Sequence, residues 1–300
     1  MNSSLNLPKN ASNNLPELLA PAGNEECLYA AVENGADAVY FGLAKPHNFN
    51  ARGRAENIPL EKLSDVMHML HRRGIKGYLT LNTLIQFDEL PAVESLLREV
   101  IAARIDAVII QDIGVAVLAH RLCPGLPLHA STQMSITSAT AIEQVSKLGI
   151  RRVILPRELS IKQIAELRRR TDVELECFIH GALCISYSGQ CYASLGLGNF
   201  GQDNHGQGIR SANRGNCAQP CRLPYSIVQS GTEQSGIGKK PVQGKPILSP
   251  HDLAALPVLQ KLIATGIHAF KIEGRLKPPE YVAEVTRIYR EALDYSGVFP

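Results

Sequence analysis

Two pairs of cysteines are the side chains of this sequence best suited to bind a metal. Cys184 and Cys191 are spaced C-x6-C, whereas Cys217 and Cys221, in "RGNCAQPC", are spaced C-x3-C. A glycine- and asparagine-rich stretch separates the two pairs. This arrangement is typical of a metal centre, because each pair can wrap one edge of the site while the loop lets the second pair fold back.

The spacing also indicates which metal group the cysteines would hold. Zinc ribbons and fingers prefer closely spaced cysteines in both pairs, so the C-x6-C pair fits zinc poorly. An iron–sulfur cluster tolerates wider spacing, because a cubane is larger than a single ion. Gly181, Gly189 and Gly215 would let backbone amides approach the cluster sulfurs. The sequence therefore predicts an iron–sulfur cluster on the four cysteines, with zinc as the alternative metal.

The other cysteines and a nearby histidine are open to plainer interpretations. Cys27 and Cys123 fall in helical patterns and Cys177 falls inside a strand, so all three are interpreted as small buried hydrophobes. His180 could be a general base, a neighbour of the cluster, or a strand-end residue hydrogen-bonded to the backbone. A Cys184 nucleophile activated by His180 is a further alternative, but it leaves the three other cysteines of the two pairs unexplained.

The elements that would position these residues follow a repeated pattern, in which a helix ends in glycine and a short apolar, β-branched run follows. Such runs are typical of parallel strands buried on both faces. With amphipathic helices between them, eight runs predict an α/β fold of the TIM-barrel type. A doubly wound sheet is the alternative, but no run leads into a glycine-rich dinucleotide fingerprint. The eight runs are Pro16–Ala22, Gly35–Phe41, Gly74–Leu81, Asp106–Asp112, Pro127–Thr132, Gly149–Leu155, Asp172–Ile179 and Gly266–Ile272.

A barrel of this type carries its chemistry at the carboxyl ends of the strands. Polar side chains gather at these positions in the sequence, as expected for a binding mouth. They are Asn50, Arg52, Asn82, Gln111, Asp112, Ser131, Gln133, Arg157, Glu158, His180, Glu273 and Arg275.

The sequence divides into a tail and one domain. Residues 1–15 are polar and predict a disordered N-terminal tail, and residues 16–300 predict a single barrel domain. Residues 184–250 form an inserted subregion before the last strand, which contains the cysteines. Within it, Ser194–Asn216 predicts a long loop. "RLPYSIVQS" and "KPILSP" then predict a β-hairpin excursion.

Composition narrows the classes of function. The 300 residues are 45% hydrophobic and carry a net charge of +3, which permits a nucleic-acid partner without indicating one. No apolar run is long enough to cross a bilayer, and the N-terminal tail lacks the apolar core of a signal peptide. We therefore expect a cytoplasmic protein without membrane contact, whose cysteines are reduced or bind metal. The H-E-x-x-H and G-x-S-x-G motifs of hydrolases are missing.

The cysteine segments resemble the signature of the peptidase U-32 family, the collagenase-like proteins. The resemblance rests first on "ECFIHGALCISYSGQC" and extends over nearly all of the chain after residue 16. Further matching segments are "ELLAPAGNEECLYAAVENGADAVYFGL", "FNAR", "HASTQM", "RGNCAQPCRLPY", "LSPHDL" and "KIEGRLKPPEYV".

The resemblance implies an activity other than the proteolysis for which the family is named. Its better understood branches are oxygen-independent hydroxylases that carry an iron–sulfur cluster and use prephenate as the hydroxyl source. One branch modifies a transfer RNA wobble uridine, another a ribosomal RNA cytidine, and a third works in anaerobic ubiquinone synthesis. "RSANRGNCAQPCRLPY" is most similar to the RNA-modifying branches. An RNA-modifying hydroxylase with a 4Fe-4S cluster, a prephenate co-substrate and an RNA partner is therefore implied.

On this interpretation, the four cysteines of the two pairs are the metal ligands, and six other side chains take part at the barrel mouth. Two arginines would bind the carboxylates of the donor, since a guanidinium group pairs bidentately with a carboxylate. Two amides would help to bind substrate, and two further residues would handle protons. In that order, they are Arg52 and Arg275, Asn50 and Gln133, and Glu273 and His180.

Two departures from the family pattern leave alternatives open. Ala254 stands where many relatives have a cysteine, so either Cys217 and Cys221 both bind the cluster or the cluster keeps an open position. Larger relatives continue beyond the last helix, so this chain is expected to be a minimal core, a subunit that needs a partner, or a truncated reading frame. The alternative functions are a peptidase and a zinc-stabilised, non-catalytic subunit.

Overall fold

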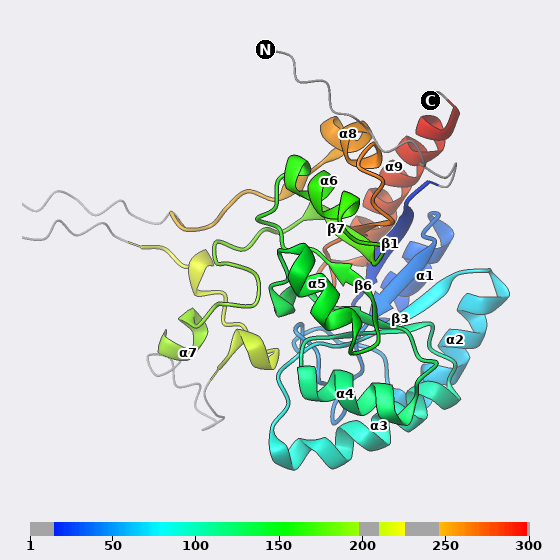
Figure 1. Cartoon of the computed structure of the whole chain (residues 1–300), viewed down its shortest axis with the longest axis vertical. Helices are drawn as coiled ribbons and strands as arrows, with labels where there is room; N and C mark the ends of the chain where they lie inside the picture. Colours follow the sequence, from blue (N-terminus) through cyan, green and yellow to red (C-terminus); the bar gives the residue numbers. More distant parts are fainter. Residues whose placement is uncertain (1–14, 198–209, 226–245, 299–300) are drawn as a thin grey trace, which may run out of the picture.

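Eight parallel strands form a closed barrel in the computed structural model, which describes residues 15–197, 210–225 and 246–298 (Figure 1). The strand order is β6-β5-β4-β3-β2-β1-β9-β7, and pairing of β7 with β6 closes the ring. Seven strands lie within their predicted runs and β7 extends two residues beyond its run, to Gly181, so the TIM-type barrel is confirmed. The strands are β1 (Glu17–Ala22), β2 (Ala38–Phe41), β3 (Lys76–Leu81), β4 (Ala107–Ile110), β5 (Leu128–Ala130), β6 (Ile150–Ile154), β7 (Glu174–Gly181) and β9 (Ala269–Ile272).

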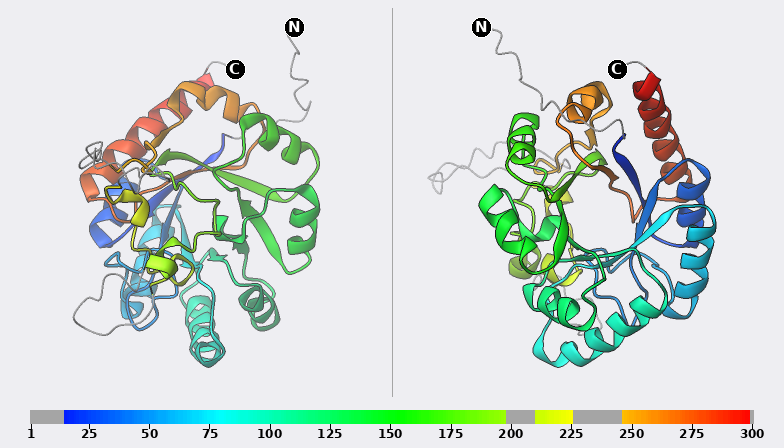
Figure 2. Two further views of the ribbon diagram at one scale, coloured as in Figure 1. Left: turned by 90° about the vertical axis from the view of Figure 1, so that its left-hand side faces the viewer. Right: turned by 45° about the vertical axis from the view of Figure 1, so that its right-hand side comes forward.

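Helices surround the barrel and bury their apolar sides against it (Figure 2). Gly149 and Gly266 have φ values of +87° and +75°, the left-handed conformation predicted where a helix turns into the next strand. The α-helices are α1 (Glu25–Glu33), α2 (Leu63–Arg72), α3 (Leu90–Ala102), α4 (Ile113–Leu122), α5 (Ala139–Ser146), α6 (Ile161–Arg169), α7 (Ala193–Leu197), α8 (Leu259–Ile263) and α9 (Pro279–Val298). The 3-10 helices are η1 (Leu60–Lys62), η2 (Phe87–Glu89), η3 (Thr132–Met134), η5 (Ala212–Arg214), η6 (Pro220–Arg222) and η7 (Leu256–Val258).

The inserted subregion differs in part from the prediction. The segment predicted as a loop contains the short helices α7 and η5, because contacts with the barrel and with the second cysteine pair order its two ends. A two-residue strand, β8 (Leu253–Ala254), lies outside the ring and pairs antiparallel with the end of β7. Most of the predicted β-hairpin and of the predicted N-terminal tail lies outside the described residues. Among the helices that the structure describes, none combines the length and apolar character needed to cross a membrane.

The inside of the barrel is charged near the amino ends of the strands. Arg152 of β6 forms ion pairs with Glu17 at 2.6 Å and with Glu176 at 3.4 Å. Lys271 of β9 donates to the other oxygen of Glu176 at 3.0 Å. Lys76 at the surface pairs with Glu17 at 2.8 Å and completes a chain of alternating charges. Each buried charge in this chain is therefore neutralised by a neighbour, as a low-dielectric interior requires.

Replacing Arg152 should test how much the fold depends on this chain. We expect Arg152→Met to lower the free energy of unfolding by about 3–5 kcal/mol, because Glu17 and Glu176 would be left buried without their guanidinium partner. The neighbouring, exposed Arg151 offers a matched control. Arg151→Met should change the free energy of unfolding by less than about 0.5 kcal/mol. Urea titrations of both variants would provide the measurement. Equal free energies of unfolding in Arg152→Met and in the parent would contradict a stabilising role for the alternating charges.

The same chain predicts a pH dependence. Burial raises the pKa of Glu17, but Arg152 and Lys76 outweigh burial and hold this pKa below its ordinary value of 4.5. A depressed pKa contributes stability that is present above about pH 4.5 and is lost as the pH falls through the folded-state pKa. Unfolding free energies measured between pH 7 and pH 3 should therefore fall less steeply in Arg152→Met than in the parent. Parallel curves would show that Arg152 does not depress this pKa.

Candidate functional site

A cavity of about 190 Å³ lies at the carboxyl ends of the barrel strands. Inward-facing strand residues form its inner wall, and the loops that follow the strands surround it. The segments that carry the two cysteine pairs complete the wall. Strand residues in the wall are Tyr40, Thr80, Ile109, Ile154, Phe178 and Lys271.

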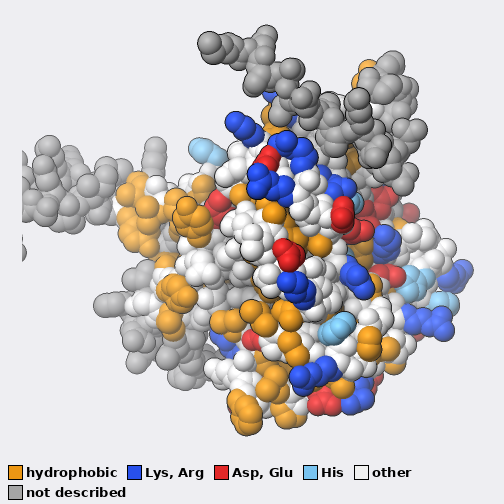
Figure 3. Space-filling model, viewed as in Figure 1, with side chains coloured by type: hydrophobic (Ala, Val, Ile, Leu, Met, Phe, Trp, Pro, Cys, Tyr) orange, Lys and Arg blue, Asp and Glu red, His pale blue; other side chains and the backbone are white. Residues whose placement is uncertain are grey.

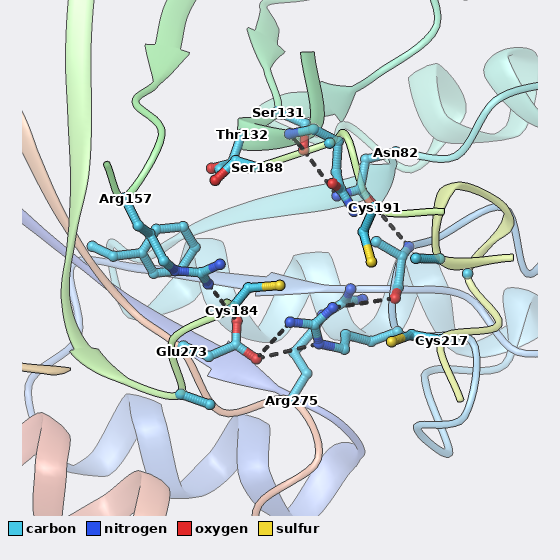
Figure 4. Close-up of a pocket in the computed structure, with 18 of the residues that line it drawn as sticks. Asn82, Ser131, Thr132, Arg157, Cys184, Ser188, Cys191, Cys217, Glu273 and Arg275 are labelled. Carbon is cyan, nitrogen blue, oxygen red and sulfur yellow. Dashed lines mark hydrogen bonds and ion pairs between the residues drawn. The ribbon is translucent and has the colours of Figure 1, made fainter. Parts of the chain in front are cut away.

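Glu273 lies between two arginines at one side of the cavity (Figure 4). Its Oε1 is 3.2 Å from Arg52 Nη2, and its Oε2 is 3.3 Å from Arg157 Nη2. Arg157 also stacks on Phe178, with 3.9 Å from its guanidinium carbon to the ring centre. Burial raises the pKa of Glu273, but Arg52, Arg157 and Arg275 outweigh burial and hold this pKa below its ordinary value. Glu273 is thus an ionised carboxylate that orients both paired guanidinium groups.

Arg275 is buried in the wall without an ion pair to any carboxylate among the described residues. Its Nη1 donates to Asn50 Oδ1 at 3.0 Å and to Thr80 Oγ1 at 2.9 Å. Burial is the main cause that lowers the pKa of Arg275 to about 10, so the group stays charged at neutral pH. A buried cation with only neutral hydrogen-bond acceptors favours an anion beside it. The three arginines Arg52, Arg157 and Arg275 and the single carboxylate of Glu273 together carry a net charge of +2.

Lys271 connects the cavity with the charged chain inside the barrel. Its ammonium group donates to Glu176, lies 3.9 Å from the centre of the Tyr40 ring and lines the cavity. Burial is the main cause that lowers the pKa of Lys271. The amine is therefore a candidate proton donor at the inner end of the cavity, with Glu176 as its partner.

All four cysteines of the two pairs line the same cavity, and none is in a disulfide. Figure 4 shows the sulfur atoms of Cys184, Cys191 and Cys217 around a common space beside Glu273 and Arg275. Burial raises the pKa of the Cys221 thiol, and repulsion from the other three thiolates raises it further. Two segments that are far apart in the sequence thus bring their thiols together, as their spacing predicts.

Hydrogen bonds support one of these sulfurs directly. The backbone N–H of Gln219 donates to Cys217 Sγ at 3.4 Å, and the hydroxyl of buried Ser194 lies 3.9 Å from the same atom. Ser194 also accepts from the N–H of Ala218 at 3.0 Å. Donors aimed at a cysteine sulfur are typical of the surroundings of iron–sulfur clusters, where they tune the potential.

The barrel fixes the positions of both cysteine segments. Ser188, between the first pair, donates its N–H to Glu158 at 2.6 Å. Arg214 precedes the second pair and forms two contacts with Glu89, at 2.5 and 2.6 Å. Arg222 connects the segments, because its Nη2 donates to the carbonyl of Leu183 at 2.8 Å. The thiols are therefore held by contacts within the protein.

The donor set at the cavity consists of thiols, which can bind either a zinc ion or an iron–sulfur cluster. No three His, Cys, Asp or Glu side chains in the described part of the chain converge on one ion position. A zinc ion would need its sulfur ligands at about 2.3 Å from one point. Cysteine thiolates are the ligands of iron–sulfur clusters, so the four free thiols that line this cavity are of the type that a cluster would need.

The structure brings most of the predicted site residues together. Arg52, Gln133, Glu273 and Arg275 line the cavity with the four cysteines. Asn50 lies behind the wall, fully buried, and accepts hydrogen bonds from Arg275 and from the backbone of Arg52. The role predicted for it in substrate binding is therefore indirect in this structure.

His180 is not among the residues that line the cavity. Its Nδ1 is 3.4 Å from Tyr289 Oη, and its ring packs against Tyr281 and Tyr289. The register of β7 against β9 shifts between Phe178 and His180, so Phe178 lines the cavity while His180 contacts α9. Its role in proton transfer stays a prediction, and the structure favours the interpretation of a strand-end residue held by local contacts.

Three polar strand residues of the cavity were not singled out from the sequence. Tyr40, Thr80 and Lys271 lie within strands, whereas the search considered the positions after strands. A lysine inside the buried run "AFKI" was the available signal, because an unpaired charge cannot remain in such a strand. Gly189 and Gly215 have φ values of +78° and +77°, and a Cβ there would meet the carbonyl oxygens of Gln133 and Asn50 at 2.1 and 2.3 Å. These glycines let the cysteine segments approach the barrel loops.

Comparisons place the chain among known proteins. The profile described as peptidase family U32 matches residues 23–297. The chain is 39% identical to a 23S rRNA 5-hydroxycytidine synthase of Escherichia coli, over 93% of this chain and 39% of that protein. It is 40% identical to an uncharacterized protease of Methanocaldococcus jannaschii, over 93% of this chain and 65% of the other. A tRNA hydroxylation protein of Bacillus subtilis is 35% identical, over 93% of this chain and 63% of that protein. The chain thus spans less than two thirds of each of these relatives.

The excess positive charge predicts that the cavity binds small dicarboxylates. We expect Glu273→Gln to raise the affinity for succinate about tenfold, because an incoming carboxylate would no longer compete with Glu273 for Arg52 and Arg157. Arg157→Met should lower the affinity by a similar factor. Titration calorimetry of both variants would measure the effect, with Arg151→Met, at an exposed arginine outside the cavity, as the control. Unchanged affinity in Glu273→Gln would show that the anion binds elsewhere.

Proposed function

This chain belongs to peptidase family U32, and from that premise we propose that it is a hydroxylase of RNA that holds an iron–sulfur cluster on its four clustered cysteines. Support comes from the two relatives named for hydroxylation of ribosomal and transfer RNA. The observation that carries the proposal is the arrangement of the site. Four free thiols and an excess of arginines line one cavity at the active end of the barrel.

The proposed ligands are Cys184, Cys191, Cys217 and Cys221. Ala254 does not line the cavity, whereas both cysteines of the second pair do. This supports a ligand set that does not need a side chain at position 254. Bound there, the cluster would supply redox chemistry next to the arginines.

The proposed hydroxyl donor is prephenate, as the family resemblance implies. Arg275 would bind one carboxylate of the donor, because no carboxylate in the described residues forms a direct ion pair with it. Arg52 and Arg157, spaced by Glu273, would bind the other. Glu273 is ionised and can accept a proton, whereas Lys271 at the inner wall can donate one. The wall of the cavity would thus orient the donor and exclude water from it.

Metal content tests the first half of the proposal. Protein purified without oxygen should be brown and contain about four irons and four sulfides per chain. Cys184→Ser and Cys221→Ser should lose the visible absorbance, because each removes a ligand. Cys123→Ala, at a buried cysteine outside the cavity, should keep it. A colourless protein with about one zinc per chain would contradict the cluster and favour a zinc-stabilised subunit.

Hydroxylation tests the second half. The brown protein should add a hydroxyl group to transfer or ribosomal RNA taken from cells that lack its gene, and only when prephenate is present. Nucleosides from the treated RNA would be measured by mass spectrometry, and Cys184→Ser should yield no product. Gelatin hydrolysis by cluster-free protein, abolished in Cys184→Ser, would contradict this function and favour a peptidase.

A further inference from the structure

A second hollow opens directly beside the cavity, at the ends of β4 and β5. Gln133, Gly189 and Asn213 line both spaces, so the two spaces adjoin at these residues. Gln111, Ile113 and Tyr192 line the hollow alone. We propose that this hollow binds a nucleobase of the RNA strand, next to the base that is modified in the cavity. This inference rests on the proposed function and names a recognition site for its substrate.

Two buried amide side chains that line the hollow have oxygen atoms without hydrogen-bond partners. Gln111 is 8% exposed and Asn213 is 7% exposed, yet neither side-chain oxygen has a hydrogen-bond partner among the described residues. Burying an amide without partners is unfavourable, so a ligand that supplies the missing bonds would be favoured. An amide offers both donors and an acceptor, which is the combination that reads the edge of a base.

The walls of the hollow are held in place before any ligand binds. Asp112 accepts hydrogen bonds from the N–H of Val115 and from the N–H of Ile85, both at 3.1 Å. Leu84 donates its N–H to the carbonyl of Asn213 at 3.0 Å. The two amides are therefore presented by fixed backbone, so little ordering is needed on binding.

Exposed apolar side chains stand at the rim. Tyr192 is 61% exposed, Ile113 is 59% exposed and Leu84 is 44% exposed, and all three line the hollow. Hydrophobic side chains gather on the left and lower parts of the face shown in Figure 3, the side on which α7 lies. A tyrosine ring beside amides offers a stacking surface and an edge reader together, which is how proteins recognise unstacked RNA bases.

The position of the hollow favours a neighbouring base over the reacting one. A base that reacts must lie in the cavity with the cysteines, as bases do when an enzyme extracts them from a strand. The strand would then continue past Gln133 and Asn213, which line both spaces. Exposed Arg54 on the cavity rim is available to the phosphates.

Stacking can be tested without any activity assay. The probes are fluorescein-labelled pentamers of cytidylate and of abasic ribose phosphate, and the measurement is fluorescence anisotropy at one fixed salt concentration. Tyr192→Ala should weaken binding of the cytidylate pentamer about tenfold and leave the abasic pentamer unchanged. Tyr192→Phe should bind like the parent, and so should Tyr29→Ala, which removes an exposed tyrosine on α1.

Two results would overturn stacking. Equal losses for both pentamers would show that Tyr192 acts through the fold or the phosphates, and no loss would show that the base lies elsewhere. Because Tyr192 follows Cys191, iron content and circular dichroism must match the parent before affinities are compared.

Edge reading can be tested at Gln111. A carboxylate only accepts hydrogen bonds, so Gln111→Glu should shift the ratio of cytidylate to uridylate affinity towards cytidylate about fivefold, through the cytosine amino group. Gln111→Leu should weaken both pentamers. An unchanged ratio in Gln111→Glu would overturn the assignment of this amide. If the protein binds the pentamers in a base-dependent way but hydroxylates no RNA, the proposed function is wrong and this inference stands. If the protein hydroxylates RNA but binds the pentamers without regard to base, this inference is wrong and the proposed function stands.

Discussion

The need to neutralise every charge inside the barrel is the constraint on which the rest of the structure depends. Arg152 is almost completely buried, and it persists because Glu17 and Glu176 surround it. Removing one partner of such a group costs about 3–5 kcal/mol, a large share of the stability of a typical domain. The alternating charges continue through Lys271 to the inner wall of the cavity. The fold and the site therefore share one electrostatic network, and neither can change its charges independently.

At the mouth of the barrel this neutrality is incomplete. Glu273 pairs with Arg52 and Arg157, whereas Arg275 is held only by an amide and a hydroxyl. Such a surplus of buried positive charge is unfavourable on its own, and a protein retains it where a ligand supplies the missing negative charge. The same reasoning applies to the unpartnered amide oxygens of Gln111 and Asn213 in the adjoining hollow. The surplus arginine and these two amide oxygens all lie near the strand ends, where a TIM barrel binds its ligands.

The sequence predicted the barrel well because its signals are local. Each strand lies in a short apolar run, four of the eight runs begin at a glycine, and each run can be recognised without knowing its neighbours. The types and spacing of the four cysteines also predicted that the two pairs come together, and all four line one cavity, whereas their role as metal ligands stays a prediction. The residues of the cavity wall were harder to predict. Tyr40 and Lys271 lie within strands, and which side chains of a strand face the cavity depends on how the strand is placed in the barrel. The position of His180 depends on a shift of register between β7 and β9, which is a property of pairing between distant segments that no local pattern encodes.

The cysteine segments show how a site can be prepared by the fold that surrounds it. Contacts of Ser188 with Glu158 and of Arg214 with Glu89 tie the two segments to different barrel loops. Arg222 then ties the second segment to Leu183 of the first. In small metal-binding domains the metal itself organises the ligands, so binding and folding are one event. Here the barrel supplies a large core and already gathers the thiols, so a bound cluster would be needed for chemistry more than for folding. Loss of the cluster should accordingly leave a folded barrel, which is why measurements of metal content and of RNA binding can be interpreted separately.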